Sequence, residues 1–570
     1  MAKKQHHTAE PAEGADDVSA TVHALTQVAQ SLTQSATQMM QTMQAMQHLF
    51  QGRAQVGGGA ATAGPQTQIN TWGDDPYSEE TPTDDPPLAT PIKVPVPVNN
   101  FPLLQIQIID RGPPPGLYDP GSANFRYWVA FEALTRGINF WGERLPPGTR
   151  WTTLSAPMQV NLAAGEDLNA NYSRQFGLRF YQDTVQGVQI FSGESPDVSC
   201  HELGHAILDA VRPELFDAAS IEVASFHESF GDMSAILSAL QLDAERELVF
   251  AETEGHLNVN SRLSRLAEQL GWAIRQLSPT AADPDCLRNA ANRFFYRDPD
   301  DLPPSAPASQ LASEPHSFSR VFTGAFLDAL ARMLTTAGQV SAGGLRTVSR
   351  DLGQLLIDGV RLAPITSGYY SQVAAAMIQA DQARFNGRYR TALSSAFIQH
   401  GILAPSSSAA LTKAPTPQMM PSAAPPGAGF EGFVGAAPLL PTFGQESEGY
   451  RSTAHDAPQL PTLTVATQFG MDIEVLAPAE PPRFNVVSAA LGAAAAAPTR
   501  APKDDARAFV EDLIQNGHVD FASVHGVVVA ELAATGERSR SKKTHTLVAD
   551  GDGKMLLKRL HFNCGCRRCR

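Results

Sequence analysis

The chain has 570 residues, 43% of them hydrophobic, which is enough for a large core and for three or four domains. Its formal net charge of −15 argues against general nucleic-acid binding, which needs a basic face. No apolar run approaches the roughly 18 residues of a membrane span, and the lysines near the N-terminus are not followed by an apolar signal core.

These features favour a cytoplasmic protein, with export by a route that leaves no N-terminal signal as the open alternative. The chain has five cysteines, and Cys564, Cys566 and Cys569 crowd the C-terminus, so they do not resemble a disulfide framework. A reducing compartment fits this cysteine usage.

The first part of the chain carries a heptad pattern. Apolar residues from Val18 to Phe50 recur at alternating spacings of four and three, with Gln, Ser and Thr between them. We favour an N-terminal heptad helix in residues 1–51 that oligomerises or binds a partner. A lone helix or a disordered Gln-rich tail are the alternatives. Residues 52–100 are rich in Gly, Pro and Thr and predict a disordered linker.

Residues 101–403 form the only long stretch with dense apolar periodicity, and they predict the main folded domain. Residues 404–460 are a Pro/Ala-rich linker, and 461–570 a small C-terminal α/β segment with a Cys-rich tail. Within that segment we predict a helix over 504–517 and a hairpin over 544–562 around Asp-Gly-Asp-Gly.

The tail has two readings. His561 with Cys564, Cys566 and Cys569 could hold zinc or another soft metal. The default expectation is flexible, reactive thiols beside arginines, because two thiols separated by a single residue fit poorly around one tetrahedral ion.

The stretch CHELGH contains His201, Glu202 and His205. Residues four apart share one helix face, so the two imidazoles can bind one ion while Glu202 reaches a ligand of the metal. Such a pattern should arise by chance only about 0.02 times in a chain of this length. The motif therefore predicts a zinc-binding helix.

A catalytic zinc site needs a third protein ligand. Leu208 and Val211 occupy the positions where the metzincin pattern requires Gly and His, so that option fails. The stretch ASFHESFGD offers Glu228 as the third ligand and Asp232, on the same helix face, as the acceptor for a ligand histidine's free N–H. His227 points about 100° away from Glu228 and is not expected to bind the metal.

HELGH followed by HESFGD resembles the thermolysin-like gluzincin zinc metallopeptidases, whose pattern is HExxH and then ExxxD. The resemblance covers roughly residues 120–400. It implies an α+β fold with a mixed β-sheet N-terminal lobe and a helical C-terminal lobe that hold the zinc between them.

Further motifs extend the resemblance. LNANYSRQFGLRFY looks like the family's substrate edge strand, with Asn169 and Ala170 as its Asn-Ala pair. CLRNAANRFFYRDPDDL places Arg288 as the arginine that binds a substrate carbonyl. EPHSFSRVFTGAFLDAL places His316 as the histidine that stabilises the transition state. By the same resemblance Val198 and Leu287 line the pocket for the residue after the cut, which implies an apolar preference.

Two positions depart from the family pattern. Phe216 stands where the family has a tyrosine that helps hold the oxyanion, and phenylalanine offers no donor. Leu311 stands where an aspartate orients the transition-state histidine, and Glu314 is the nearest acid that could replace it. The family's calcium ligands are only partly met, because Asp197 fits one and Glu247 and Glu252 are no more than candidates.

The sequence thus predicts a zinc endopeptidase that hydrolyses peptide bonds by metal-activated water, with Glu202 as the general base. Its partner is a peptide or protein substrate. One rival interpretation is a catalytically weak or inactive peptidase-like scaffold, which the heptad helix and Phe216 favour and the intact Glu202 opposes. The other is a zinc-dependent regulator that uses the C-terminal thiols.

Overall fold

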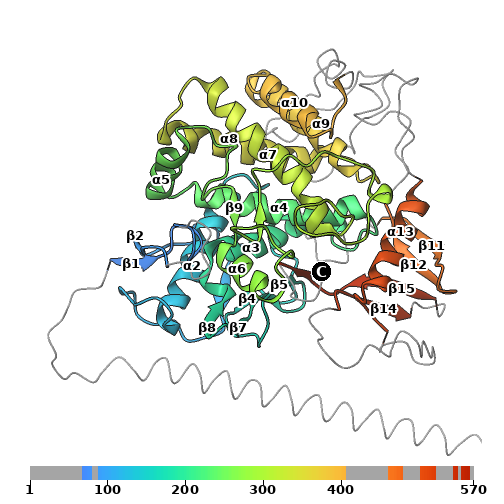
Figure 1. The fold of residues 1–570 in the computed structure, drawn as a ribbon, viewed down its shortest axis with the longest axis horizontal. Coiled ribbons are helices and arrows are strands. Elements are labelled where there is room, and N and C mark those ends of the chain that lie inside the picture. Colours follow the sequence, from blue (N-terminus) through green and yellow to red (C-terminus); the bar gives the residue numbers. More distant parts are fainter. Residues whose placement is uncertain are drawn as a thin grey trace, which may run out of the picture. The chain divides into compact units, whose positions relative to one another are not determined.

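A computed structural model describes residues 67–79, 88–405, 460–478, 501–521, 543–549 and 554–564 as an α+β arrangement of helices and several small sheets (Figure 1). The predicted N-terminal heptad helix, residues 406–459 of the expected linker, Cys566 and Cys569 lie outside the described residues.

The first third of the described chain consists of short strands around one long helix, α2. Helix α2 begins after Ser122, whose side chain accepts from the backbone N–H of Phe125 and so caps an otherwise unpaired donor. The elements are β1 (Gln68–Thr71), β2 (Ile92–Pro95), β3 (Ile106–Ile108), α2 (Ala123–Gly142), β4 (Met158–Asn161), β5 (Ala170–Ser173), β6 (Gly177–Phe180), β7 (Gln182–Val185) and β8 (Val188–Phe191).

A mixed five-stranded sheet has the order β16-β5-β6-β4-β3. Strands β3, β4 and β6 run parallel to one another, whereas β5 is antiparallel to β6. Strand β16 (Phe562–Asn563) comes from the far end of the chain and pairs antiparallel with β5, with Phe562 opposite Tyr172. An edge strand offers unpaired N–H and C=O groups, and here a distant segment takes them up.

The second part of the main domain is largely helical. Helices α3 and α4 pack closely and α7 packs on α4, and every residue of α4 is buried. The elements are α3 (Pro196–Val211), α4 (Ile221–Ala239), α5 (Asp243–Thr253), β9 (Arg265–Leu266), α6 (Glu268–Leu277), β10 (Arg288–Asn289), α7 (Pro315–Ala337), α8 (Ala342–Leu362), α9 (Tyr369–Phe385) and α10 (Arg390–Gln399), with 3-10 turns at Ser192–Glu194, Pro213–Leu215 and Pro299–Asp301.

A second five-stranded sheet, ordered β11-β12-β15-β14-β13, belongs to the C-terminal segment, drawn in orange and red in Figure 1. The predicted helix and hairpin strands are present, as α13 and as antiparallel β14 and β15. The elements are β11 (Thr462–Ala466), β12 (Asp472–Leu476), α13 (Pro502–Gln515), β13 (Val519–Asp520), β14 (His545–Ala549) and β15 (Met555–Arg559).

Two predicted boundaries are wrong. Residues 67–79 and 88–100, expected within the disordered linker 52–100, contain β1 and β2, and Ile69 and Trp72 are buried against α2. Two strands of four residues each need few apolar side chains, so the Gly- and Pro-rich composition concealed them.

The C-terminal segment 461–570 is also not a separate unit. The backbone N–H of Ala219 donates to Leu476 O at 2.7 Å, and Arg559 Nε donates to Phe216 O at 2.8 Å. Strand β16 then enters the sheet of the main domain. Local sequence pattern does not report contacts between segments this far apart in the chain.

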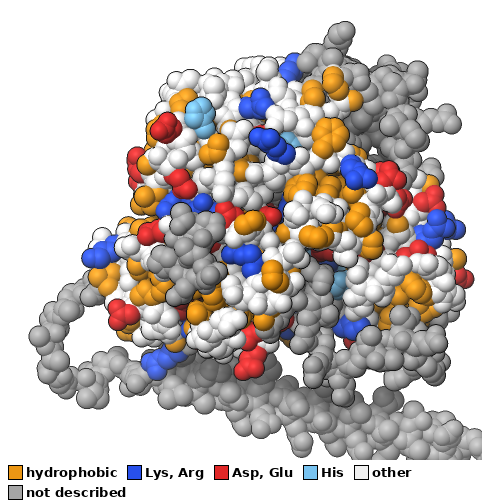
Figure 2. Space-filling view, in the orientation of Figure 1, with side chains coloured by type: hydrophobic (Ala, Val, Ile, Leu, Met, Phe, Trp, Pro, Cys, Tyr) orange, Lys and Arg blue, Asp and Glu red, His pale blue; other side chains and the backbone are white. Residues whose placement is uncertain are grey.

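On the face drawn in Figure 2, acidic and basic side chains are interspersed among the described residues. This face therefore lacks, within the described part of the chain, the continuous basic patch that nucleic-acid binding needs. None of the described helices has the length and apolar character needed to cross a bilayer.

Candidate metal and catalytic site

Helix α3 carries the HExxH motif and has a well-formed start. The Ser195 side chain accepts from the backbone N–H of Val198, and Pro196 occupies the first turn. Helix α4 begins in the same way, with Ser220 accepting from the N–H of Val223. These caps fix the two helices whose side chains meet at the site.

Two glycines allow α3 and α4 to approach closely. A Cβ atom on Gly204 would lie 2.8 Å from the Cα of Gly231, and one on Gly231 would lie 2.6 Å from the ring of His201. Both distances are shorter than side chains tolerate. The imidazole of His201 therefore uses space that exists only because residue 231 has no side chain.

His201, His205 and Glu228 converge as the sequence predicts. Their donor atoms all lie within 4.8 Å of one another, with His201 Nε2 3.3 Å and His205 Nε2 3.8 Å from the Glu228 carboxylate. All three side chains are buried. Within the described residues, His201 Nε2, His205 Nε2 and Glu228 Oε2 lack hydrogen-bond partners.

Buried polar atoms without partners are costly, and three that converge on one point fit a bound cation. Two imidazoles and one carboxylate are the donor set of catalytic zinc sites, which leave a fourth position open. Burial, followed by the nearby His201, lowers the pKa of His205 well below its ordinary value. His205 is therefore in the neutral form that binds metals.

Asp232 lies where the sequence places it, beside His201. Its Oδ1 is 2.9 Å from His201 Nδ1, and Arg288 donates to the same carboxylate from Nη2 at 2.7 Å and from Nε at 3.1 Å. Burial opposes ionisation of Asp232, but Arg288 and His201 outweigh it and hold its pKa well below the ordinary range. The ionised carboxylate orients His201 so that Nε2 faces the cluster.

His227 does not join the metal group, as expected. Its Nδ1 lies 3.1 Å from Nδ1 of His205, so one ring donates to the other. The ring of Phe562 stacks on His227 at a centroid distance of 4.0 Å and on His205 at 4.7 Å. His227 thus orients His205, and both rings stack on Phe562.

Glu202 is fully buried, and within the described residues neither of its carboxylate oxygens has a hydrogen-bond partner. Burial raises its pKa to about 8, although the neighbouring His201 acts in the opposite direction. A buried acid beside the group formed by His201, His205 and Glu228 is in a position from which it can exchange a proton with a molecule bound there.

His316 lies at the start of α7 and contacts Glu228. Its Nε2 is 3.4 Å from Glu228 Oε2, and its Nδ1 contacts Glu314. Burial lowers its pKa, but Glu228 and Glu314 outweigh burial and raise it to about 9. Glu314, and not Leu311, is thus positioned as the acid beside His316.

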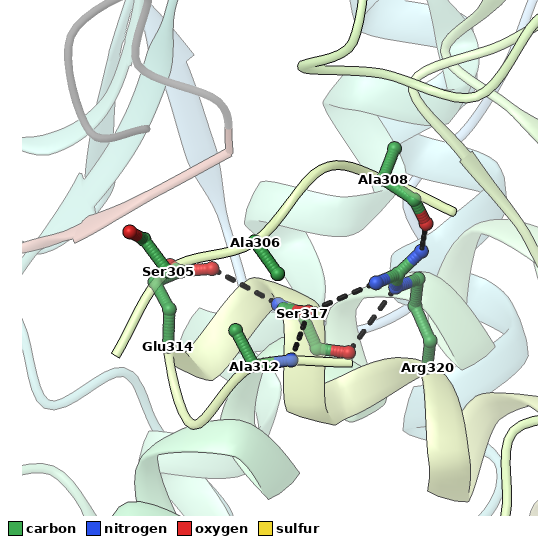
Figure 3. Close-up of a pocket in the computed structure, with 7 residues that line it drawn as sticks. All are labelled: Ser305, Ala306, Ala308, Ala312, Glu314, Ser317 and Arg320. Atoms are coloured by element: carbon green, nitrogen blue, oxygen red, sulfur yellow. Dashed lines mark hydrogen bonds between the residues drawn. The ribbon is translucent and has the colours of Figure 1, made fainter. Parts of the chain in front are cut away.

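The loop before α7 is fastened to the helix. Arg320 donates to the Gln310 carbonyl at 2.7 Å. It also donates to Ser317 Oγ at 2.9 Å, and Glu314 Oε2 accepts from the N–H of Ser317 at 3.0 Å (Figure 3). These contacts surround a small pocket lined by Ser305, Ala306, Ala308, Ala312, Glu314, Ser317 and Arg320. They hold Glu314 and His316 in place, and the metal cluster lies outside the pocket.

The predicted substrate edge strand is β5, and the C-terminal strand β16 lies along it. The N–H of Cys564 donates to Ala170 O at 3.0 Å, and Asn169 Nδ2 donates to Asn563 Oδ1 at 3.4 Å. Arg288 Nη1 donates to Cys564 O at 2.8 Å. Asn169, Ala170 and Arg288, which the resemblance assigned to substrate binding, thus contact the protein's own C-terminal segment.

The remaining predicted positions are all buried. Phe216 packs edge-on against Phe562 at 5.4 Å and against Tyr172 at 6.1 Å, so an apolar contact stands where the family has a hydroxyl donor. Val198 and Leu287 belong to the main core cluster, which also contains Cys564.

A second group of acids is buried beneath the first turn of α3. Carboxylate oxygens of Asp75, Asp197 and Glu268 lie within 4.8 Å of one another. Burial raises the pKa of Asp197 to about 8, and burial with the charges of Asp75 and Asp74 raises that of Glu268 well above its ordinary value. Such a group needs either bound protons or a cation.

Of the calcium candidates in the sequence, only Asp197 lies in this group. Glu247 is exposed, and Glu252 pairs with Arg262 and Arg265. Sequence reasoning missed Asp75 and Glu268, because they come from the supposed linker and from a helix with no motif. The adjacent acids Asp74 and Asp75 beside Trp72 were the only local signal.

No family model matches the chain, and no curated protein gives a significant match.

Proposed function

We propose that this chain is a zinc-dependent endopeptidase of the thermolysin-like gluzincin type, with the zinc held between a mixed-sheet lobe and a helical lobe. The convergence of His201, His205 and Glu228, with unpartnered donor atoms, carries the proposal. Asp232 and Glu202 stand beside them in supporting positions.

When bound by these three residues, zinc lowers the pKa of a water molecule and polarises a carbonyl oxygen. Glu202 accepts a proton from the attacking water and delivers it to the leaving amine.

The oxyanion needs donors aimed at it. His316 Nε2 lies near Glu228 and is the donor placed for the oxyanion, whereas Arg288, held by Asp232, is placed to bind the next carbonyl group of the peptide. Both side chains lie where a peptide on β5 presents its carbonyl groups. Strand β5 binds an extended peptide by adding it to the sheet edge, so that backbone groups give affinity and side-chain pockets give preference.

The test pairs zinc content with casein cleavage for the wild-type chain and for Glu202→Gln. We expect one tightly held zinc per chain in both, and cleavage that falls on the order of 10²- to 10⁴-fold in the variant. A His205→Ala chain should lose the zinc. Absence of zinc from the wild-type chain would overturn the site as drawn.

A second candidate is a catalytically weak, peptidase-like interaction protein. Phe216 favours it, because its ring contacts Phe562 and supplies no donor to an oxyanion. Zinc in both chains with cleavage in neither would support this candidate.

A further inference from the structure

The C-terminal strand β16 pairs with the edge of β5 as an extended peptide would. Phe562 lies opposite Tyr172 and Asn563 opposite Asn171 in antiparallel register. This pairing uses the β5 edge that the proposed function reserves for substrate. The segment on this edge therefore belongs to the same chain, and the contacts of its backbone groups are known.

Both ends of one peptide bond are held. The carbonyl oxygen of Asn563 accepts from His316 Nε2 at 2.6 Å, and the N–H of Cys564 donates to Ala170 O at 3.0 Å. His316 Nε2 is also 3.4 Å from Glu228 Oε2, which brings the Asn563 carbonyl beside the metal cluster.

The flanking groups are held as well. Arg288 donates to the carbonyl of Cys564 at 2.8 Å. Phe562 stacks on His227 and is covered by Arg559, whose guanidinium carbon lies 4.1 Å from the ring centroid. The bond between residues 563 and 564 therefore lies in the middle of an anchored segment.

The base is adjacent to this bond. The thiol of Cys564 groups with a nitrogen of His201 and a carboxylate oxygen of Glu202, all within 4.8 Å of one another, whereas the three-ligand cluster is His201, His205 and Glu228. Residue 564 thus lies on the Glu202 side of the site, where a leaving amine would receive its proton.

From this register we propose that the chain is its own substrate and cleaves the peptide bond between Asn563 and Cys564. The inference rests on the proposed peptidase function. Water adds its oxygen to the carbonyl carbon of Asn563, and the C–N bond to Cys564 breaks. Glu202 accepts a proton from the water and passes it to the nitrogen of Cys564. The products are a chain ending in the Asn563 carboxylate and a free peptide of residues 564–570.

The first experiment follows the intact mass of the full chain, purified with a chelator and then given zinc. We expect the wild-type chain to lose the mass of residues 564–570 at a rate independent of protein concentration, as cleavage within one molecule requires. The Glu202→Gln chain should keep its full mass. Cys564→Pro removes the backbone N–H that donates to the carbonyl oxygen of Ala170, and this variant should not be cut. Cys564→Ser keeps that N–H and should still be cut.

Casein cleavage by the same samples separates the two proposals. A wild-type chain that cleaves casein but keeps residues 564–570, or is cut at another bond, overturns the self-cleavage and leaves the peptidase function standing. Cleavage of neither casein nor the tail overturns both. Loss of the cut in Cys564→Ser would show that the thiol, and not the backbone register, governs the tail, and would also contradict the proposal.

A binding readout in metal-free Glu202→Gln protein is independent of turnover. Alkylation of Cys564, followed by peptide mapping, should be about tenfold faster or more when Phe562→Ala removes the aromatic anchor. Val548→Ala, on the exposed part of β14, is the matched control and should leave the rate unchanged. Equal rates in all three chains would mean that β16 is not held against β5, and would contradict the proposal.

Discussion

The carboxylate of Glu314 contacts Nδ1 of His316, two residues further along the chain. Because Glu314 also caps α7 through the N–H of Ser317, its position is fixed by the same turn that carries the histidine. The chain thus supplies an orienting acid from a different position than the one occupied by Leu311.

We predict that Glu314→Gln lowers kcat by about tenfold to a hundredfold with little change in KM, because glutamine still caps the helix but holds no charge against His316. His316→Ala should cost on the order of 10²- to 10³-fold. The double variant should be no slower than His316→Ala alone, since Glu314 acts through the histidine. Steady-state kinetics on one peptide substrate measure all three, and fully additive losses would refute the pairing.

The space beside His201 leads to a second prediction. A Cβ atom on residue 231 would meet His201 Cε1 and Nδ1 at 2.6 Å, and Nδ1 is the atom that faces Asp232. We expect Gly231→Ala to displace the ring and to weaken zinc binding about tenfold to a hundredfold, as changes around a metal ligand commonly do. Competition with a chromogenic chelator measures the affinity.

Gly343→Ala is the control for that experiment. Gly343 lies in the first turn of α8, where an added Cβ would meet only Ser341 Oγ at 3.9 Å. The change should leave zinc affinity unaltered and stabilise the helix by up to about 1 kcal/mol. Equal zinc affinity in Gly231→Ala and Gly343→Ala would show that the close helix approach does not position the histidine.

The part of the site that the sequence predicts is the part built from local spacing. His201 and His205 lie one helical turn apart, as do Glu228 and Asp232, so each pair shares a face whatever the surrounding fold. The close approach of the two helices depends on Gly204 and Gly231, which occupy variable positions of the HExxH and ExxxD patterns. The α+β class was predicted from the resemblance to the thermolysin-like metallopeptidases. Strands β1 and β2 were not predicted, because their segment has the composition of a linker.

Contacts between distant segments could not be predicted. The side chains of Asn169 and Asn563 are 394 positions apart in sequence and 3.4 Å apart in space. A two-residue strand such as β16 has no periodicity of its own, because its pairing depends on an edge formed elsewhere. The acid group at Asp75, Asp197 and Glu268 was missed for the same reason.

That acid group gives a third prediction, for calcium. Oxygen ligands suit calcium, and carboxylate oxygens of these three buried acids lie within 4.8 Å of one another. With zinc saturated, calcium at 100 times its Kd should stabilise the chain by about 2.7 kcal/mol and raise Tm by a few degrees. Asp197→Asn should lose this response, and Glu247→Gln, at an exposed position, should keep it.

Shared protons are the competing explanation for the same group. In that case calcium leaves Tm unchanged, and Asp197→Asn is as stable as the wild-type chain or more so, because an uncharged side chain replaces a buried acid. Differential scanning calorimetry with and without calcium distinguishes the two cases.

The last prediction concerns Glu222, buried in the first turn of α4. Its carboxylate accepts from the hydroxyl of Tyr296 at 2.6 Å and from the backbone N–H of Tyr370 at 2.9 Å. Burial outweighs these bonds and raises its pKa from 4.5 to about 8. Between those values the unfolded chain releases the proton while the folded chain keeps it, so the free energy of unfolding should fall as pH rises through this window.

Glu222→Gln removes the titrating group and should flatten this dependence between pH 4.5 and about 8. Urea unfolding at several pH values measures it, with Glu247→Gln as the exposed control and constant m-values as the check that the transition is unchanged. The comparison is a difference between chains, so other titrating acids cancel. Identical slopes in the wild-type and Glu222→Gln chains would mean that Glu222 is already ionised when folded, stabilised by Tyr296 and Tyr370 despite its burial.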